Sequence, residues 1–351
     1  MLADLVDHVI GVDPDRDRFT VSLLDAMSGG ELATEEFATT RSGYLEAIEW
    51  ADAHSDASSR VWVLEGAGSY GSGLCQTLTA EAEWAIEFDR PASRPARDGA
   101  KTDRLDALRA GREALGRVKW ADPRARGSRE GLRALLVARN GAQRARTAAI
   151  NELKALVLTA HVDLRDQLRD LTRRELIARC QRLRPDPHGD LEMFGTKTAL
   201  RALAQRIGQL TSEAAAIEAA MGPFIEDLGP QLLDEIGIGT VTAAQILVSW
   251  SHPGRCRNDA AFARLAGAAP IEATSGQTQQ RQRLNRGGDR QLNKALHQIV
   301  ITRSSHDQRT KNYLAKRKAD GKTPREARRC LKRFIARRIH RLLENPPQPA
   351  T

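Results

Sequence analysis

Cysteine is scarce in this sequence of 351 residues, and its four cysteines lie far apart, at Cys75, Cys180, Cys256 and Cys330. This spacing excludes the paired cysteine motifs of zinc sites and the dense disulfide frameworks of small secreted proteins. Long apolar runs are also missing, because no stretch approaches the ~20 residues of a membrane-spanning helix. The N-terminus carries acidic residues where a secretory signal has a basic segment and an apolar stretch. We therefore expect reduced cysteines, no membrane association and a cytoplasmic location.

The charge of the chain is distributed unevenly. Its formal net charge is +9 and its isoelectric point is near 9.7, a balance that suits a polyanionic partner. Residues 1–117 contain 12 Lys and Arg against 22 Asp and Glu, whereas residues 281–345 contain 20 against 5. The length predicts two or three domains. The C-terminal part is therefore the predicted nucleic-acid-binding surface.

Residues 1–120 combine strand-like and helix-like segments. Short apolar runs predict strands at 8–13, 19–24, 32–38, 60–65 and 84–88, and helical spacing predicts helices at 42–53, 70–81 and 103–114. The first three strands resemble a meander, and helices alternate with strands after them. This order predicts a mixed α/β sheet layered with helices.

Residues 121–226 are predicted to be helical, with two apolar stripes on long helices. The first stripe comprises Leu132, Leu135, Arg139, Ala142, Ala149, Leu153 and Leu156. The second has heptad spacing and comprises Leu200, Leu203, Ile207, Leu210, Ala214, Ile217 and Met221. The segment 185–189, which contains two prolines and a glycine, separates the two helices. Packing of the two helices within one subunit and dimerisation through a coiled coil are equally compatible with this pattern.

Residues 227–345 form a third, mainly helical region, followed by a predicted disordered tail at 346–351. Within it, residues 233–247 resemble a helix-hairpin-helix with Gly237 and Gly239 in the turn. Such a turn aims backbone N–H groups at a DNA phosphate without reading base sequence. An ordinary helical hairpin explains the same residues equally well.

Four acids form the first candidate site. Asp13 and Glu65 end two predicted strands, while Asp103 and Asp106 are three residues apart and share a helix face. Carboxylates crowded in this way repel each other unless hard cations neutralise them, and Mg²⁺ or Mn²⁺ accepts such ligands. A metal site of this kind supports phosphoryl transfer. The alternative is four unrelated surface acids, which is the weaker account for four such positions.

Segments 263–270, 274–276 and 284–292 form the second candidate site, with Ser275 before a glycine and arginines downstream. A serine on a glycine loop can approach a phosphate, and arginines can stabilise the charge that develops on it. By itself, Ser275 is more often a turn residue than a nucleophile. The basic residues predicted here to bind nucleic acid are Arg281, Arg283, Arg286, Arg290 and Lys294.

The C-terminal segment 325–341 carries basic residues at helical spacing, interleaved with apolar ones that are predicted to pack inward. Arg329, Arg333 and Arg337 are predicted to face nucleic-acid phosphates, so binding should weaken steeply with salt. A solvated charged face is the alternative, which the excess of one sign disfavours. The eight histidines do not cluster, and His297, the one nearest Ser275, receives no role.

Several segments together resemble the insertion-sequence 110 and 1111 type transposases. They are Ile10-Gly11-Val12-Asp13, residues 64–70, Lys101-Thr102-Asp103-Arg104-Leu105-Asp106-Ala107, residues 265–270, Ser275-Gly276 and Asn285-Arg286-Gly287-Gly288. The matching segments occur in order over nearly the whole chain.

This resemblance implies a RuvC-like (RNase H-like) domain over 1–120, a coiled-coil region over 121–226 and a transposase domain over 227–345. Asp13, Glu65, Asp103 and Asp106 would bind Mg²⁺, and Ser275 would attack a DNA phosphate to form a transient phosphoserine link. The family also implies homo-oligomers, donor and target DNA, a guide RNA encoded by the element, and a bacterial, nucleoid-associated location. We expect the metal site and Ser275 to meet across two subunits.

Three other classes remain open. A metal-dependent junction resolvase needs only the four acids and leaves Ser275 idle. A nucleic-acid-binding scaffold performs no strand chemistry. Substitution of the four acids or of Ser275 would then change no reaction. A sugar-kinase or actin-like ATPase also begins with a strand that ends in Asp, but no later glycine-rich phosphate loop follows here.

Overall fold

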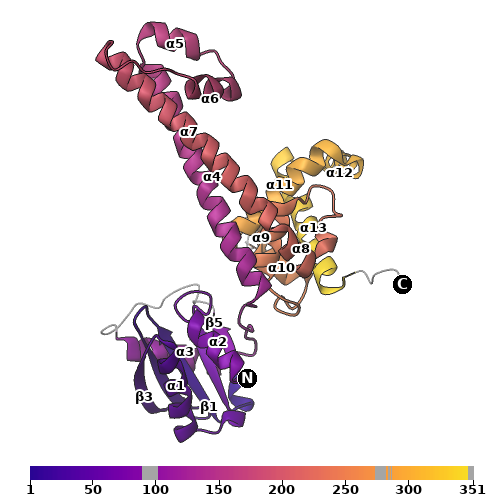
Figure 1. Cartoon of the computed structure of the whole chain (residues 1–351). Helices are drawn as coiled ribbons and strands as arrows, with labels where there is room; N and C mark the ends of the chain where they lie inside the picture. Colours follow the sequence, from indigo (N-terminus) through magenta and orange to yellow (C-terminus); the bar gives the residue numbers. More distant parts are fainter. Residues whose placement is uncertain (89–101, 273–281, 284, 286, 347–351) are drawn as a thin grey trace. The chain divides into compact units, whose positions relative to one another are not determined.

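The computed structural model describes residues 1–88, 102–272, 282–283, 285 and 287–346. The chain forms two compact units, Met1–Ala125 and Arg126–Thr351 (Figure 1). The long helices expected over 121–226 and the helices expected over 227–345 both belong to the second unit.

The N-terminal unit is built on a five-stranded sheet with the order β3-β2-β1-β4-β5. Strands β1, β2 and β3 form an antiparallel meander, whereas β4 is parallel to β1 and β5 is parallel to β4. The strands are β1 (His8–Pro14), β2 (Arg18–Asp25), β3 (Glu31–Ala38), β4 (Arg60–Glu65) and β5 (Ala85–Phe88). The helices are α1 (Arg41–His54), α2 (Ser72–Ala80), α3 (Asp103–Leu115) and the short 3₁₀ helices η1 (Leu2–Asp4) and η2 (Ala57–Ser59). Parallel strands need crossover connections, which α1 and α2 supply.

The two faces of this sheet pack against different helices, because side chains alternate along each strand. Ile10 and Val12 of β1 belong to the core that α1 and α2 cover. Val9 of β1 and Val61 and Val63 of β4 belong to the opposite core, which includes the C-terminal end of α3. Odd-numbered residues of β1 and β4 therefore face the α3 side.

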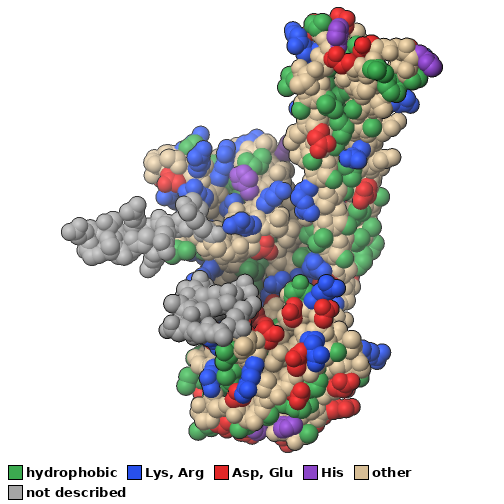
Figure 2. Space-filling view, turned by 90° about the vertical axis from the view of Figure 1, so that its left-hand side faces the viewer, with side chains coloured by type: hydrophobic (Ala, Val, Ile, Leu, Met, Phe, Trp, Pro, Cys, Tyr) green, Lys and Arg blue, Asp and Glu red, His purple; other side chains and the backbone are tan. Residues whose placement is uncertain are grey.

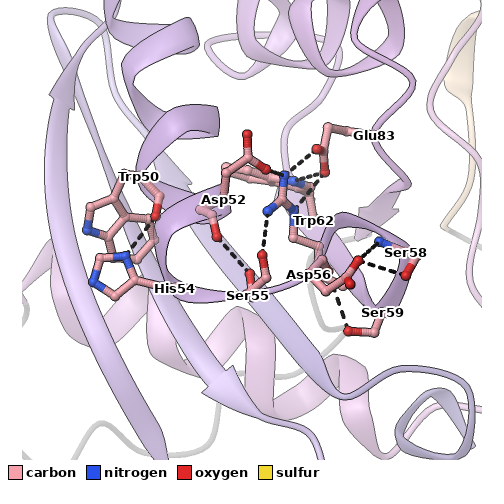
Figure 3. Close-up of polar contacts among 11 residues, drawn as sticks. Trp50, Asp52, His54, Ser55, Asp56, Ser58, Ser59, Trp62 and Glu83 are labelled. Atoms are coloured by element: carbon pink, nitrogen blue, oxygen red, sulfur yellow. Dashed lines mark hydrogen bonds and ion pairs between the residues drawn. The ribbon is translucent and has the colours of Figure 1, made fainter.

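Arg60 begins β4 with a side chain that has no solvent exposure. Its guanidinium donates to Glu83 from Nε at 3.0 Å, to Asp52 from Nη2 at 2.7 Å and to the carbonyl of Ser55 from Nη1 at 3.1 Å. The Trp62 indole also donates to Glu83, at 2.8 Å, and these partners converge in Figure 3. A buried guanidinium is costly unless its donors find acceptors, and this network gives each of its three nitrogens at least one.

The second unit is helical, and its two longest helices pack along each other. Figure 1 shows α4 leading outward to α5 and α6, and α7 returning beside it. The helices are α4 (Ser128–Thr159), α5 (Val162–Leu168), α6 (Arg173–Gln181), α7 (Leu191–Ala220), α8 (Gly222–Leu228), η3 (Pro230–Leu232), α9 (Thr240–Trp250), α10 (Asp259–Leu265), α11 (Arg290–His306), α12 (Gln308–Ala319) and α13 (Pro324–Glu344). Strands β6 (Ile271–Glu272) and β7 (Gln282–Arg283) form a two-stranded antiparallel sheet.

The apolar stripes of α4 and α7 are buried within one chain. At the far end, Leu153 of α4 and Leu200 and Ile207 of α7 share a core with α5 and α6. At the near end, Leu132 of α4 and Met221 join the core of the C-terminal helices. Packing within the subunit therefore accounts for both stripes.

Arg129 attaches the start of α4 to the C-terminal helices. Its side chain is almost fully buried, and it donates to the carbonyl of Val248 from Nη2 at 2.7 Å and from Nε at 3.2 Å. The last carbonyls of α9 have no partner within the helix, so a buried cation there is favourable. The near end of the helical pair is thereby fixed to α9.

The expected fold class is confirmed at the level of a mixed α/β unit followed by helices. The predicted tail falls almost entirely on residues 347–351, which lie outside the described residues. Among the described helices, none combines the length and apolar character needed to cross a membrane.

Candidate active site

Asp13 and Glu65 lie at the carboxyl ends of neighbouring parallel strands. Asp13 is the next-to-last residue of β1 and Glu65 is the last of β4. The register pairs Val12 with Leu64, so the next residue on each strand is one of these acids. Both acids have odd numbers and are half-buried, which places them on the α3 side. The sheet therefore brings two of the four predicted carboxylates to one edge.

Helix α3 packs across this face of the sheet. The carbonyl of Arg117, just after α3, accepts a hydrogen bond at 3.1 Å from the amide of Leu2, which precedes β1. The end of α3 thus lies near the start of β1, while Arg104 in its first turn binds Glu31, the first residue of β3, at 2.9 Å. That first turn carries Asp103 and Asp106. Asp103 and Asp106 therefore lie on the helix that covers the same face of the sheet as Asp13 and Glu65.

The four acids are nevertheless not assembled into one cluster. Asp103 is exposed, and Asp106 forms an ion pair with Arg109 at 3.2 Å. Within the described part of the chain, no three His, Cys, Asp or Glu side chains form a group that could hold a metal ion. The donor chemistry fits a hard divalent cation, since carboxylate oxygens are its preferred ligands. The complete four-acid site remains a prediction.

Gly11 allows the close approach of α3 to the sheet. A Cβ at this position would lie 2.1 Å from the carbonyl oxygen of Ala107 and 2.8 Å from the amide nitrogen of Gly111. Both neighbours are backbone atoms of α3, so the whole helix would have to move. Gly11→Ala should therefore lower the free energy of unfolding of the N-terminal unit by about 1–3 kcal/mol.

Urea denaturation followed by tryptophan fluorescence measures this change, because Trp50, Trp62, Trp84 and Trp120 all lie in the N-terminal unit. Gly116→Ala is the matched control, since a Cβ there meets nothing within 4 Å and its φ of −75° suits alanine. Equal midpoints for the two variants would contradict the close packing at Gly11.

In the C-terminal unit, two glycine-containing loops that are distant in sequence pack on each other. Gly288 has a φ of +92°, and a Cβ there would lie 2.4 Å from the carbonyl oxygen of Leu265. Gly267 has a φ of +61°, and its Cβ would lie 2.9 Å from the carbonyl oxygen of Gly287. Only glycine fits such positions without strain. Two of the three segments of the second candidate site are therefore adjacent.

A pocket of about 540 Å³ opens between these loops, the start of α11 and the first half of α13. Arg290, Arg329 and Arg333 line it, and so do Lys322 and Lys332. Figure 2 shows Lys and Arg side chains gathered over the helices of this unit, with few acids among them. The pocket thus concentrates several of the predicted nucleic-acid-binding residues.

The remaining predicted residues of this region have different environments. Ser275, Arg281 and Arg286 lie outside the described residues, and Arg283 lies on β7. Lys294 is exposed on α11. Arg337 forms an ion pair with Asp259 at 3.0 Å.

Segments of both units match models of known protein families. Residues 10–162 match the DEDD-type IS110 model described as "Transposase", and residues 231–315 match the model described as "Transposase IS116/IS110/IS902 family". The chain belongs to the IS110-type transposases. It is 30% identical over 127 residues to "Insertion element IS110 uncharacterized 43.6 kDa protein" of Streptomyces coelicolor. That match covers 36% of this chain and 31% of the relative.

The matched regions contain the candidate sites of this IS110-type transposase. The first includes Asp13, Glu65, Asp103 and Asp106, and the second includes Ser275 and the pocket arginine Arg290. A DEDD-type transposase domain suggests dependence on a divalent metal. The chain spans about a third of the length of the curated relative that it matches.

The Gly237 turn of the transposase differs from the expected pair of helices. Only the 3₁₀ helix Pro230–Leu232 and turn residues precede it, because proline and glycine interrupt the chain at 229–230. The amide of Gly239 donates to Thr242 Oγ1 at 3.0 Å, which caps α9. Gly237 has a φ of +86° and lies against α11.

Acidic residues near this turn neutralise much of the second half of α13. Glu235 binds Arg303 at 2.8 Å and Arg338 at 2.6 Å. The hydrogen bonds and the charge of Arg338 are the main cause that lowers the pKa of the Glu235 carboxyl. Asp259 binds both Arg337 and Arg341. These arginines therefore stabilise the fold of the unit.

Two residues of the pocket were missed by sequence reasoning. Lys332 belongs to the basic segment 325–341, where its spacing does not distinguish it from its basic neighbours, and Asn293 belongs to no motif. Lys332 Nζ donates to Asn293 Oδ1 at 2.9 Å, and Asn293 Nδ2 donates to the carbonyl of Ala266 at 2.6 Å. These partners are 27 and 39 residues from Asn293 in sequence, so spacing alone carries no signal for the contact.

Proposed function

We propose that this IS110-type transposase cleaves and rejoins DNA strands with the help of a divalent metal and through a serine intermediate. The position of Asp13 beside Glu65, at the carboxyl ends of neighbouring parallel strands, carries this proposal. The sheet order and strand directions also support an RNase H-like (RuvC-like) domain. The pairing of α4 and α7 supports a helical arm of coiled-coil type.

In this proposal, Asp13, Glu65, Asp103 and Asp106 hold Mg²⁺ or Mn²⁺. The bound cation would stabilise negative charge on the phosphate oxygens during phosphoryl transfer. The carboxylates would position the cation, and the close packing against Gly11 fixes on the sheet the helix that carries Asp103 and Asp106.

Ser275 supplies the attacking oxygen in this proposal. Its Oγ forms an ester bond to a DNA phosphorus while the bond from phosphorus to one deoxyribose oxygen breaks, and the serine proton leaves to a base. A deoxyribose hydroxyl of another strand then attacks the phosphoserine and releases Ser275. The two successive exchanges conserve the number of phosphodiester bonds.

The partners proposed for this reaction are donor DNA, target DNA and a guide RNA from the element, bound by a homo-oligomer. In this proposal, base pairing between the guide RNA and DNA selects the target sequence. The basic residues of the protein are suited to binding phosphates, which carry no sequence information. A nucleoid-associated, cytoplasmic location follows from action on chromosomal DNA.

The test is strand transfer between donor and target DNA, with Mg²⁺ and RNA from the flanking element. The unmodified chain is compared with Ser275→Ala and Asp13→Ala, and covalent protein–DNA adducts are trapped under denaturing conditions. We expect adduct and product in the unmodified chain and neither in the two variants. Product formation without any adduct in the unmodified chain would contradict the serine intermediate.

A metal-dependent junction resolvase is the second candidate, because the edge with Asp13 and Glu65 needs no serine. This function predicts that Ser275→Ala keeps cleaving branched DNA while Asp13→Ala does not. The same two variants therefore separate the two functions.

A further inference from the structure

The side chain of Lys332 lines the pocket in the C-terminal unit, and two successive hydrogen bonds hold its ammonium group in place. Lys332 is half-buried, and its ammonium group donates to Asn293 at 2.9 Å. Asn293 is itself fixed by the carbonyl of Ala266 at 2.6 Å. An ammonium group has three donors, so this contact leaves Lys332 able to donate to a further acceptor in the pocket. The chain of contacts gives Lys332 a defined position before any ligand arrives.

The arginines around Lys332 form no ion pair with an acid among the described residues. In the described part of the chain, no carboxylate lies within ion-pair distance of Arg290, Arg329 or Arg333. On the same helix, Arg337 and Arg338 are both neutralised by acids. Helix α13 is thus divided into a neutralised second half and a first half whose charge faces the pocket.

The two acids that line the pocket are engaged in helix caps. Asp289 Oδ1 accepts from the amides of Gln291 and Leu292 at 2.8 and 3.0 Å, and its Oδ2 accepts from Ser249 at 2.6 Å. Glu326 Oε2 accepts from the amide and the hydroxyl of Thr323 at 2.9 and 2.7 Å. Glu326 also interacts electrostatically with Lys322 and Arg329, but these two acids face five cations in the pocket lining, so a positive excess remains.

The cations that line the pocket repel one another, and this repulsion disfavours the charged form of Lys332. Burial lowers the pKa of Lys332, and the neighbouring charge of Arg329 lowers it further. An anion bound in the pocket would relieve this repulsion and favour the charged ammonium. Planar guanidinium groups match phosphate oxygens, and a lysine adds a point charge.

We propose that this pocket binds one phosphodiester group of DNA, held by Lys332 and the guanidinium groups of Arg290, Arg329 and Arg333. Asn293 is a positioning residue that holds Lys332. The start of α11 does not itself bind the phosphate, because Asp289 already caps its amides. This inference rests on the proposed action on DNA.

The test uses the full chain and a fluorescein-labelled DNA duplex of about 30 base pairs, with Kd measured by anisotropy over a range of salt concentrations. We expect the double variant Arg329→Gln/Arg333→Gln to raise Kd about 10-fold or more and to reduce the slope of log K against log salt by about 2. Lys332→Gln should reduce the slope by about 1.

Arg325→Gln is the matched control, because it removes one charge from the same helix outside the pocket. Asn293→Ala keeps every charge, so we expect Kd to rise about threefold with an unchanged slope. A Kd that stays at the parent value in Asn293→Ala would overturn the positioning role. Pocket variants that behave like Arg325→Gln would overturn the phosphodiester site.

Failure of this inference is distinguishable from failure of the proposed function. If the parent chain binds the duplex and transfers strands while the pocket variants bind as the parent does, only the pocket assignment is wrong. If the parent chain neither binds the duplex nor transfers strands with Mg²⁺ and RNA from the flanking element, both are wrong. Loss of affinity for single-stranded RNA of the same length, with duplex binding unchanged, would overturn the assignment to DNA.

Discussion

Replacing Glu65 by glutamine should slow DNA strand cleavage about 10³-fold or more, which corresponds to about 4 kcal/mol of transition-state stabilisation. The substitution keeps the size of the side chain and removes one of the two charges that the sheet places at its edge. Glu65 ends β4 in register with Asp13, so its loss weakens the hold on a cation that both would share. Single-turnover cleavage of labelled DNA in Mg²⁺ measures the rate.

Glu81→Gln is the control for this prediction, because Glu81 is an exposed residue directly after α2. We expect the control to cleave at the parent rate. Removal of divalent metal with EDTA should stop cleavage by the parent chain and by Glu81→Gln, and added Mg²⁺ should restore it. A parent-like rate in Glu65→Gln would argue for a catalytic site that excludes the β4 edge.

Glu83→Ala should lower the free energy of unfolding of the N-terminal unit by about 3–5 kcal/mol. Glu83 is 5% exposed and its partner Arg60 is fully buried, so the substitution leaves a buried cation with a weakened set of acceptors. It also removes the acceptor of the Trp62 indole. Urea denaturation followed by tryptophan fluorescence measures the change directly at this site.

Asp52→Ala tests whether burial of the ion pair is the reason for the large loss of stability expected in Glu83→Ala. Asp52 binds the same guanidinium at 2.7 Å, but its side chain is 57% exposed, so solvent screens the pair. We expect this control to cost less than about 1 kcal/mol. Comparable losses in the two variants would show that burial of the Glu83 pair does not determine its effect.

Pocket formation and the arrangement of charges are the features that sequence patterns describe least well. Short apolar runs predict the strands of the N-terminal unit to within a few residues, because such runs suit strands that are buried in a sheet. The two acids at strand ends follow from the same pattern. The helix-hairpin-helix expectation is less accurate, because Pro230 and Gly229 interrupt the chain before the Gly237 turn.

The basic C-terminal segment shows why composition alone does not locate a binding surface. Its arginines recur at helical spacing, and nothing in that spacing separates Arg333 from Arg337. The structure separates them, because Asp259 lies beside Arg337 and not beside Arg333. An ion pair between residues so distant in sequence depends on how α10 packs against α13.

The sequence by itself therefore determined the order of strands and helices, the opposite charges of the two ends and the candidate acids, because these depend on local periodicity and residue type. Tertiary structure alone decided that Arg60 is buried against Glu83 and that the Gly267 and Gly288 loops meet. It also decided which arginines of α13 keep an unneutralised charge. The reason is physical: burial and ion pairing depend on distances between segments far apart in the chain, and packing sets those distances.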